Sequence, residues 1–275
     1  MQIYTRGNRI LAYAAIKKVN HQPVPEGNFY HMRKLSSQDI SAMVELSSCI
    51  YHSLGKGQEC FIHQHNRAYY EQMMRNLRMH FVGAFKGRQL IAMSYVRIVR
   101  SRKELFEEFP TADNAFLGKN FQVACLGADS VHPDYRGNKI NENMIRYRMK
   151  HAQALGVNDC VSIIDRKNIW NMRPYFANNF VMMGADVDPS DGGDIALMHR
   201  RLDKGANYNR EKYIEIPVER YQLLDKLFAG GNAAVGYNSE SNALQIVPCD
   251  DYHPQRGRPQ QWNLLLSAKG GCYVD

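Results

Sequence analysis

The sequence predicts a mixed α/β fold, and three observations support this. The 275 residues are 44% hydrophobic and 23% charged, a composition typical of folded globular domains and not of disordered or fibrous chains. Strand-like and helix-like stretches alternate along most of the chain, with antiparallel strands expected early and a strand-helix-strand unit late. No repeat of fixed period is visible, which excludes solenoids and propellers.

The first predicted elements are a strand followed by two helices. Phe29–Leu35 alternates loosely between apolar and polar residues, as a half-buried strand does. Ser36–Asp39 then offers capping side chains ahead of Ile40–Ile50, where the apolar residues have helical spacing. A second helix is expected from about Asn66 to Leu77.

A hairpin and a strand-helix pair come next. Phe81–Phe85 and Leu90–Val99 flank a Lys-Gly-Arg turn, which predicts a β-hairpin. Phe121–Val131 is predicted as a strand, and Asn141–Leu155 as a helix that ends at Gly156. Further short strands are predicted at Cys160–Ile164, Val181–Met183 and Ile195–Met198.

The composition changes after about Lys204, where a segment rich in Gly and Pro has one clear helix, near Val218–Phe228. We expect an N-terminal extension at 1–27, a main domain at 28–203, which is the span of the family resemblance given below, and this C-terminal segment at 204–275. About 70 loop-rich residues bury too little surface to fold alone, so we expect the last segment to be an appendage packed on the main domain.

Cysteine use and charge favour a cytoplasmic protein with an anionic partner. Six cysteines are scattered without a Cys-x-x-Cys pair, and the apolar run Ile10–Ile16 is too short to span a bilayer. The small-residue triplet Ala12–Ala14 has only two apolar residues before it, so we expect no cleavable signal peptide. The formal charge of +8 favours an anionic partner such as nucleotide, acyl-CoA, RNA or membrane. Because the basic residues form no long block, we expect neither nucleic acid nor membrane to be the partner.

The junction between the predicted strand at Phe121–Val131 and the following helix is a candidate anion site. Residues Val131–Asn141 run through a glycine-containing turn into a helix, and such a turn presents unpaired backbone N–H groups and the positive helix end to one point. This geometry suits a pyrophosphate. An ordinary strand-to-helix turn is the alternative that this stretch alone leaves open.

Two motifs carry a resemblance to a known family. Arg136 and the Val-x-Pro-x-Tyr residues before it resemble the cofactor motif of the GNAT superfamily, the acyl-CoA-dependent N-acyltransferases. Lys139 and Asn141 stand where that family usually has small residues, so Lys139 either turns its side chain away or places its ammonium on the phosphates.

The second motif lies about 30 residues downstream. Asn168, Tyr175 and Phe180 have the intervals of the family's pattern after its fifth strand, with Asn179 in place of the usual glycine. Asparagine tolerates the left-handed conformation that ends a helix. Pro174 disfavours helical geometry at the residue before it, so we expect the helix that carries Tyr175 to start late.

The resemblance implies a GNAT fold, with a mixed central sheet splayed at the acyl-CoA site, helices on both faces and the C-terminal appendage. It implies transfer of an acyl group, most often from acetyl-CoA, to an amine by direct attack in a ternary complex, with no metal. Tyr175 matches the general acid, which would protonate the departing thiolate. The residues that the resemblance assigns to acyl-CoA binding are Ser130, Val131, Arg136, Gly137, Asn138, Lys139, Ile140, Asn141, Glu142 and Asn168.

Asp129 is the candidate for the general base. Side chains alternate along a strand, so Asp129 is expected on one face with Gly127 and Val131, as base or as a water-orienting group. Capping of a turn and exposure to solvent are the other readings. Many relatives deprotonate the amine through water.

Other functions remain open at this stage. A GNAT-shaped binding protein without activity and an enzyme that acylates an RNA-linked amine, such as charged transfer RNA, are the alternatives. The acceptor amine, the acyl length and the assembly, a homodimer included, do not follow from the sequence. A neighbourhood rich in Cys and His matches no standard zinc spacing, and its members are Cys49, His52, Cys60, His63, His65 and His80.

Overall fold

The computed structural model describes residues 2–6, 9–58, 61, 64–108, 122–188, 192–203 and 212–249. Contacts divide the chain into two compact units: unit 1 comprises residues 1–100 and 122–160, and unit 2 comprises residues 101–121 and 161–275. Strands and helices alternate in both, which confirms the mixed α/β class. The boundaries at 27 and 203 and the splay of two central strands stay predictions.

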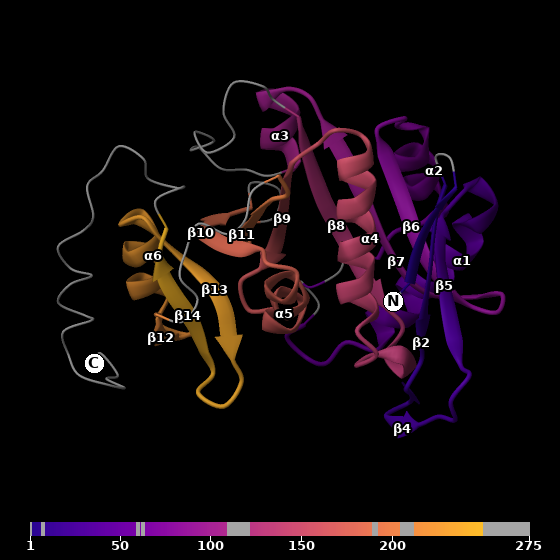
Figure 1. Ribbon diagram of the computed structural model, residues 1–275, viewed down its shortest axis with the longest axis horizontal. Helices are drawn as coiled ribbons and strands as arrows, with labels where there is room; N and C mark the ends of the chain where they lie inside the picture. Colours follow the sequence, from indigo (N-terminus) through magenta and orange to yellow (C-terminus); the bar gives the residue numbers. More distant parts are fainter. Residues whose placement is uncertain are drawn as a thin grey trace. The chain divides into compact units, whose positions relative to one another are not determined.

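Unit 1 is built on an antiparallel sheet in the order β1, β2, β5, β6, β7, β8 (Figure 1). The expected extension 1–27 supplies its first two strands and a separate small hairpin, β3 with β4. The strands are β1 (Gln2–Arg6), β2 (Arg9–Ala15), β3 (Lys18–Val19), β4 (Gln22–Pro23), β5 (Phe29–Lys34), β6 (Met79–Lys86), β7 (Gln89–Val99) and β8 (Val123–Val131). Phe121, the expected start of β8, lies outside the described residues.

Helices cover both faces of this sheet. The helical elements of unit 1 are the 3-10 turns η1 (Ser37–Asp39) and η4 (Pro133–Tyr135), and the helices α1 (Ile40–His52), α2 (Arg67–Arg75) and α4 (Ile140–Ala154). Alternate residues of β6 point to opposite sides, so Val82 and Ala84 pack with α4 while Phe81 and Phe85 pack with α1 and α2. Figure 1 shows α4 lying along the β6–β8 part of the sheet.

The sequence signals at the helix ends work as predicted. Ser36 and Asp39 form a capping box ahead of α1, and Asp39 also pairs with Arg33 at 2.7 Å. Asn66 caps α2 by accepting a hydrogen bond from the Tyr69 backbone N–H at 3.0 Å. Gly87 adopts φ +58° in the turn between β6 and β7, which confirms the predicted hairpin.

Unit 2 continues the strand-helix pattern. Its strands lie in the order β9, β11, β10, β13, β14, β12. Its elements are α3 (Arg102–Glu108), β9 (Asp159–Asp165), α5 (Ile169–Ala177), β10 (Val181–Val187), β11 (Asp194–Arg201), β12 (Ile214–Pro217), α6 (Tyr221–Ala229), β13 (Asn232–Asn238) and β14 (Ala243–Pro248).

The C-terminal segment is joined to the rest of unit 2 through its backbone. Strand β13 pairs antiparallel with β10, and α6 packs against both of these strands. Arg166, which follows β9, binds the Asp225 carboxylate of α6 at 2.7 Å and lies over the Tyr221 ring at 4.4 Å. The helix predicted near Val218–Phe228 is therefore present as α6, and it is docked within unit 2. Among the helices of the described ranges, none is long and apolar enough to cross a membrane.

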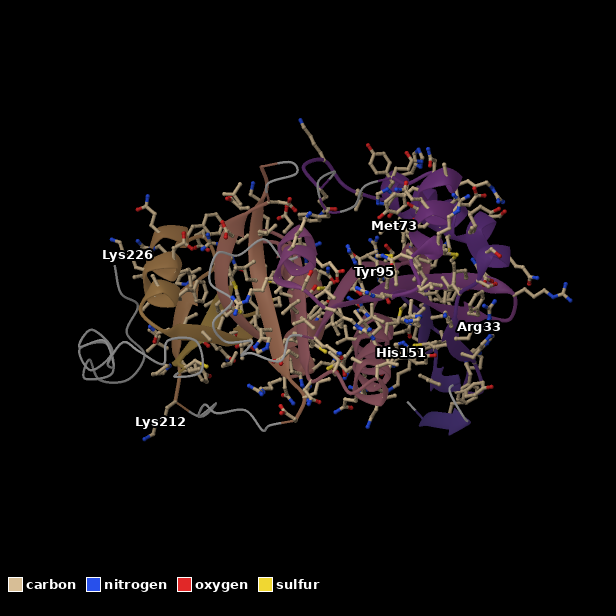
Figure 2. The ribbon with its side chains drawn as sticks, turned by 90° about the horizontal axis from the view of Figure 1, so that it is seen from above. Arg33, Met73, Tyr95, His151, Lys212 and Lys226 are labelled. Carbon is tan, nitrogen blue, oxygen red and sulfur yellow. The ribbon has the colours of Figure 1, made fainter. Side chains whose placement is uncertain are left out.

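Two histidines of unit 1 are held neutral inside the protein. The rings of His80 in β6 and His151 in α4 meet edge to face, with their centroids 4.6 Å apart; Figure 2 labels His151. Burial, His151 and Lys34 together lower the pKa of His80 to about 4, and burial and Lys34 lower the pKa of His151. Nδ1 of His80 and Nε2 of His151 are buried, and neither has a hydrogen-bond partner among the residues that the structure describes. Protonation of either ring therefore opposes folding.

We expect this pair to destabilise the fold in acid. The unfolded chain takes up protons below about pH 6.5, whereas folded His80 does so only near pH 4, so the free energy of unfolding should fall as the pH drops through that window. His80→Asn should flatten this dependence, measured by urea unfolding between pH 4 and 7.5. His21→Asn, at an exposed position whose φ of +63° asparagine tolerates, is the matched control. An unchanged slope in His80→Asn would contradict the assignment.

Candidate functional site

The turn between β8 and α4 has the backbone shape of an anion site. Gly137 has φ +77° and Lys139 has φ +57°, so two left-handed residues flank Asn138 and lead directly into α4. The helix begins at Ile140, one residue earlier than predicted. Because the first N–H groups of a helix have no partner within it, they are directed out of its N-terminal end, where the helix dipole is positive.

The small N-terminal hairpin is fastened to this turn by one side chain. Asn138 is buried, and its Oδ1 accepts hydrogen bonds from the backbone N–H groups of Lys17 at 2.8 Å and Lys18 at 3.1 Å. Its Nδ2 donates to the carbonyl oxygens of Lys18 at 2.7 Å and Tyr135 at 2.9 Å. Both acceptor positions and both hydrogens of the Asn138 amide are therefore engaged in these four hydrogen bonds. Only the backbone of Asn138 is left to bind a ligand.

The hairpin brings a lysine to the turn. A Cβ atom added to Gly137 would lie 2.4 Å from Nζ and Cε of Lys18, so the end of this side chain rests on the glycine. Arg136 and Lys139 are exposed beside it, and Arg136 donates to Ser53 Oγ at 3.3 Å. Within the described ranges no carboxylate pairs with Lys18 or Lys139, since the first-turn acid Glu142 is bound to Arg146 at 2.9 Å. Positive charge therefore gathers at a positive helix end.

Strand β8 carries a bulge just before the turn. Gly127 pairs with Tyr95 and Ser130 pairs with Met93, so two residues of β8 stand opposite the single residue Ser94. Ala128 has φ +53°, which marks the extra residue. Val131, next along the strand, pairs with Ala92.

The bulge corrects the expected face of Asp129. An extra residue shifts the alternation by one, so Asp129 does not share a face with Gly127. A Cβ on Gly127 would lie 2.5 Å from the Tyr95 ring, whereas the Asp129 carboxylate binds Arg148 of α4 at 2.5 Å. The side chains of Arg148 and Asp129 are 0% and 2% exposed, so the carboxylate neither faces solvent nor stands alone.

Arg148 connects α4 to both strands beside the bulge. It donates to the carbonyl oxygens of Tyr95 at 3.0 Å and Gly127 at 3.4 Å, in addition to the Asp129 carboxylate. Ser94, opposite the bulge, is buried, and its hydroxyl has no partner among the described residues. Because buried hydroxyls in proteins are usually hydrogen-bonded, Ser94 is a polar group that a ligand at the bulge could satisfy.

In unit 2, Asn168 begins the helix that carries the second motif. Its side chain accepts from the Asn171 N–H at 3.2 Å, and α5 runs from Ile169 through Pro174. The expected late start is therefore wrong. The cap fixes the first turn ahead of the proline, which then removes a single hydrogen bond later in the helix.

Tyr175 lies deep inside unit 2. Its side chain is 0% exposed, its hydroxyl accepts from Ser162 Oγ of β9 at 3.0 Å, and its ring meets Phe180 edge to face at 4.9 Å. Asn179 adopts φ +61°, which confirms that asparagine holds the left-handed position at the end of α5. The bond from Ser162 uses a lone pair of the phenol and not its hydrogen.

The structure brings together the predicted residues from Ser130 to Glu142 in unit 1, and Asn168 with Tyr175 in unit 2. The meeting of these two groups stays a prediction. Ile140 is a core side chain, so only its backbone can serve the site. Cys60 and His63 of the Cys/His neighbourhood lie outside the described residues; in the part that is described, no cluster of three or more metal-ligating side chains occurs.

Comparison with known proteins gives a similarity of fold. No protein-family model and no curated protein matches the chain. Among solved structures it is similar to PaiA N-acetyltransferase of Thermoplasma acidophilum in complex with coenzyme A, at 21% identity over 62% of this chain and 98% of that one, TM-score 0.44. A GNAT-family acetyltransferase from Streptococcus pneumoniae gives 11% identity, 62% and 99% coverage and a TM-score of 0.46. Ribosomal-protein-alanine N-acetyltransferase from Brucella melitensis gives 15% identity over 62% of this chain and 99% of that one, with a TM-score of 0.44.

The GNAT resemblance itself rests on the two sequence motifs around Arg136 and Tyr175. Activity and substrate do not transfer at such identities, because one fold hosts many functions.

Sequence reasoning missed two residues of the site. Arg148 follows Met144 and precedes Ala152 by one helical turn, so it interrupts the apolar stripe of α4, and a charge on such a stripe is a usable signal. Lys18 gave no signal, because about 120 residues separate it from the turn it reaches.

We expect Arg148 and Asp129 to be energetically coupled. Arg148→Met leaves a buried carboxylate without its partner, which should lower the free energy of unfolding by about 3–5 kcal/mol. Asp129→Asn should also destabilise, and the double variant should lose much less than the sum of the two. Urea unfolding of the four proteins measures the coupling. Additive losses would show that Asp129 does not depend on Arg148, and would return it to the candidates for the base.

Proposed function

We propose that the chain is an N-acyltransferase that transfers an acyl group, in the first instance acetyl, from acyl-CoA to an amine by direct attack in a ternary complex. The observation that carries this proposal is the β8–α4 turn, where left-handed backbone, a helix N-terminus and the ammonium of Lys18 converge on Gly137. The GNAT resemblance of the sequence, which includes this turn and the separate motif from Asn168 to Phe180, also supports it.

The pyrophosphate of CoA fits this turn for electrostatic reasons. Backbone groups from Gly137 to Glu142 face the bound phosphates, as in other phosphate sites at helix N-termini. Lys18, Arg136 and Lys139 add charge, and charge-assisted bonds to phosphate are stronger than neutral ones. Gathering these cations at a positive helix end is unfavourable without an anion, so a bound pyrophosphate offsets the repulsion.

The pantetheine arm and the thioester are assigned to Ser130, Val131 and the bulge. A bulge takes one residue out of the hydrogen-bonded ladder, so the backbone at Ala128–Asp129 can turn a donor toward the thioester oxygen. Such a donor stabilises the negative charge of the tetrahedral intermediate. Asn168 stays a proposed contact of the cofactor through the start of α5.

The chemistry divides among few groups. The amine must lose a proton before it attacks, and we assign that proton to water, because the Asp129 carboxylate is occupied by Arg148. After the neutral amine attacks, its nitrogen is positively charged and carries a second proton that it must lose. Collapse of the intermediate breaks the carbon–sulfur bond, Tyr175 gives its phenolic proton to the departing thiolate, and the proton from the nitrogen returns through water to the Tyr175 phenolate, so that a neutral amide and the CoA thiol are formed. Ser162 donates to the phenol oxygen of Tyr175 and so holds the ring in place. This bond does not use the phenolic hydrogen that Tyr175 would donate.

The rival functions make different predictions for simple binding measurements. A binding protein without activity would bind acetyl-CoA but transfer nothing to any amine. An enzyme acting on charged transfer RNA would bind the RNA with an affinity that falls steeply with salt.

Lys18→Ala should weaken acetyl-CoA binding. Loss of a charge-assisted bond to phosphate corresponds to an increase of about tenfold or more in the dissociation constant, measured by calorimetry. Lys150→Ala removes the same charge from an exposed position near the other end of α4 and should leave the affinity unchanged. If Lys18→Ala and the wild type bind acetyl-CoA with equal affinity, Lys18 and its hairpin do not contribute to the binding site.

Tyr175→Phe should lower turnover by about 10²-fold to 10⁴-fold, as expected for loss of a general acid, while the dissociation constant of acetyl-CoA changes little. Release of CoA is followed over a panel of amines. Tyr237→Phe is the control, since it removes a hydroxyl that bonds only locally, to Asn242 at 2.8 Å. Full turnover in Tyr175→Phe would make the tyrosine a packing residue.

A further inference from the structure

A tyrosine hydroxyl from β7 lies against β8 just before the bulge. Tyr95, labelled in Figure 2, pairs with Gly127, and its side chain reaches across to the neighbouring strand. A Cβ atom added to Gly127 would lie 2.5 Å from Cζ and 2.6 Å from the hydroxyl oxygen of Tyr95. The phenol hydroxyl therefore stands next to Ala128, the extra residue of the bulge.

This close approach depends on glycine at position 127. Gly127 does not have a positive φ, so its backbone conformation does not itself require glycine. In the interior of a strand glycine weakens the pairing, and it often marks a place where another group comes close. Here that group is the end of the Tyr95 side chain. The missing side chain at 127 is what lets the hydroxyl lie directly on β8.

Aromatic neighbours hold the Tyr95 ring in place. The centroids of the Tyr95 and Phe81 rings are 5.7 Å apart with 65° between the ring planes, and Phe81 meets Tyr70 edge to face at 6.1 Å. All three rings belong to the cluster that packs with α1 and α2. The hydroxyl is thus fixed on the face of the sheet opposite the Arg148–Asp129 ion pair. A donor that is already in position does not have to be reorganised during a reaction.

The surface around this hydroxyl is partly open to solvent. Ala128 is exposed, and Gly127 and Tyr95 are half-buried. Tyr175, the tyrosine already assigned to the proposed mechanism, is by contrast completely buried in unit 2. A ligand that runs along this part of β8 can therefore come against the hydroxyl of Tyr95.

We infer that Tyr95 is a catalytic residue of the acyl transfer, as a second hydrogen-bond donor to the thioester oxygen. The inference rests on the proposed function, which assigns the thioester to the bulge and a backbone donor at Ala128–Asp129 to its oxygen. A carbonyl oxygen has two lone pairs and accepts two hydrogen bonds. The backbone donor can bind this oxygen from within the sheet, and the Tyr95 hydroxyl from the face that carries α1 and α2.

The hydrogen bond from Tyr95 strengthens as the reaction proceeds. The amine nitrogen attacks the carbonyl carbon, a carbon–nitrogen bond forms, and the π electron pair moves onto oxygen, which becomes negatively charged. Tyr95 donates a hydrogen bond to this oxygen and keeps its own proton. When the carbon–sulfur bond breaks, the electron pair returns and the carbonyl forms again. Because a hydrogen bond to a charged acceptor is about twice as strong as one to a neutral acceptor, Tyr95 stabilises the intermediate more than the bound thioester.

Binding measurements test the contact with the carbonyl oxygen. Calorimetry compares acetyl-CoA with S-ethyl-CoA, which has the same chain length but no carbonyl oxygen. The wild type should bind acetyl-CoA more tightly, and Tyr95→Phe should reduce this preference by about two- to tenfold, the effect of one neutral hydrogen bond. The dissociation constant of S-ethyl-CoA should not change. Tyr69→Phe alters another half-buried tyrosine of the same cluster and should keep the full preference, as should Tyr175→Phe, which acts on sulfur.

Turnover tests the stabilisation of the charged intermediate. Release of CoA over a panel of amines should fall by about 10²-fold to 10³-fold in Tyr95→Phe, the usual cost of removing one donor to an oxyanion, and should be unaffected in Tyr69→Phe. A residue that only packs would alter the affinity for S-ethyl-CoA or the stability of the fold and leave the preference for the carbonyl intact. An unchanged preference or full turnover in Tyr95→Phe would overturn the inference.

The two ligands also separate this inference from the proposed function. If the wild type binds neither acetyl-CoA nor S-ethyl-CoA, the proposed function fails, and the inference fails with it. If it binds both equally and acylates amines, the proposed function stands and the role of Tyr95 is overturned. If it prefers acetyl-CoA, loses this preference in Tyr95→Phe and acylates no amine, acyl transfer fails while the contact between Tyr95 and the carbonyl oxygen is supported.

Discussion

A buried charge holds the centre of unit 1 in place. The Arg148 guanidinium is completely buried, and a buried cation is tolerated only when its hydrogen bonds and its charge are both satisfied. Asp129 satisfies the charge, and Arg148 also donates to carbonyl oxygens of β7 and β8 and to the Met144 carbonyl of its own helix. Helix α4, the β8 bulge and β7 are thereby fixed relative to one another. The turn that follows β8 and the start of α4 depend on this arrangement for their geometry.

The N-terminal segment is part of the candidate site and not an addition to it. Strand β2 pairs with β5 in the main sheet, and the small hairpin after it is held on the turn by the four hydrogen bonds of Asn138. One amide side chain therefore couples the shape of the turn to the position of Lys18. A substitution at Asn138 would disturb both at once, which is why Lys18 itself is the cleaner position to vary.

Local patterns predicted most of the elements, because capping, periodicity and turn residues act over a few positions. The Ser36 capping box, the Gly87 turn and the left-handed Asn179 all follow from neighbours in sequence. The bulge at Ala128 was not predictable, because it depends on how β8 meets β7 and leaves no mark in the alternation of residues. That single inserted position puts Asp129 on the face of α4, where it pairs with Arg148, and its role as a base stays a prediction. Pro174 was misjudged for the opposite reason, since a local rule was outweighed by the cap at Asn168.

Lys139 is where the sequence departs most informatively from the GNAT motif. It holds φ +57°, a conformation that costs a residue with a Cβ roughly 1 kcal/mol or more and that glycine adopts freely. A lysine in such a position lowers the stability of the fold relative to glycine. We therefore expect its side chain to make an interaction that glycine cannot make. Next to the N-terminus of α4, the gain from an ammonium is electrostatic, and it is realised only with an anion at the turn. In the proposed function, the left-handed Lys139 and the Lys18 ammonium on Gly137, which pairs with no carboxylate among the described residues, serve the same ligand charge, although they come from opposite ends of unit 1.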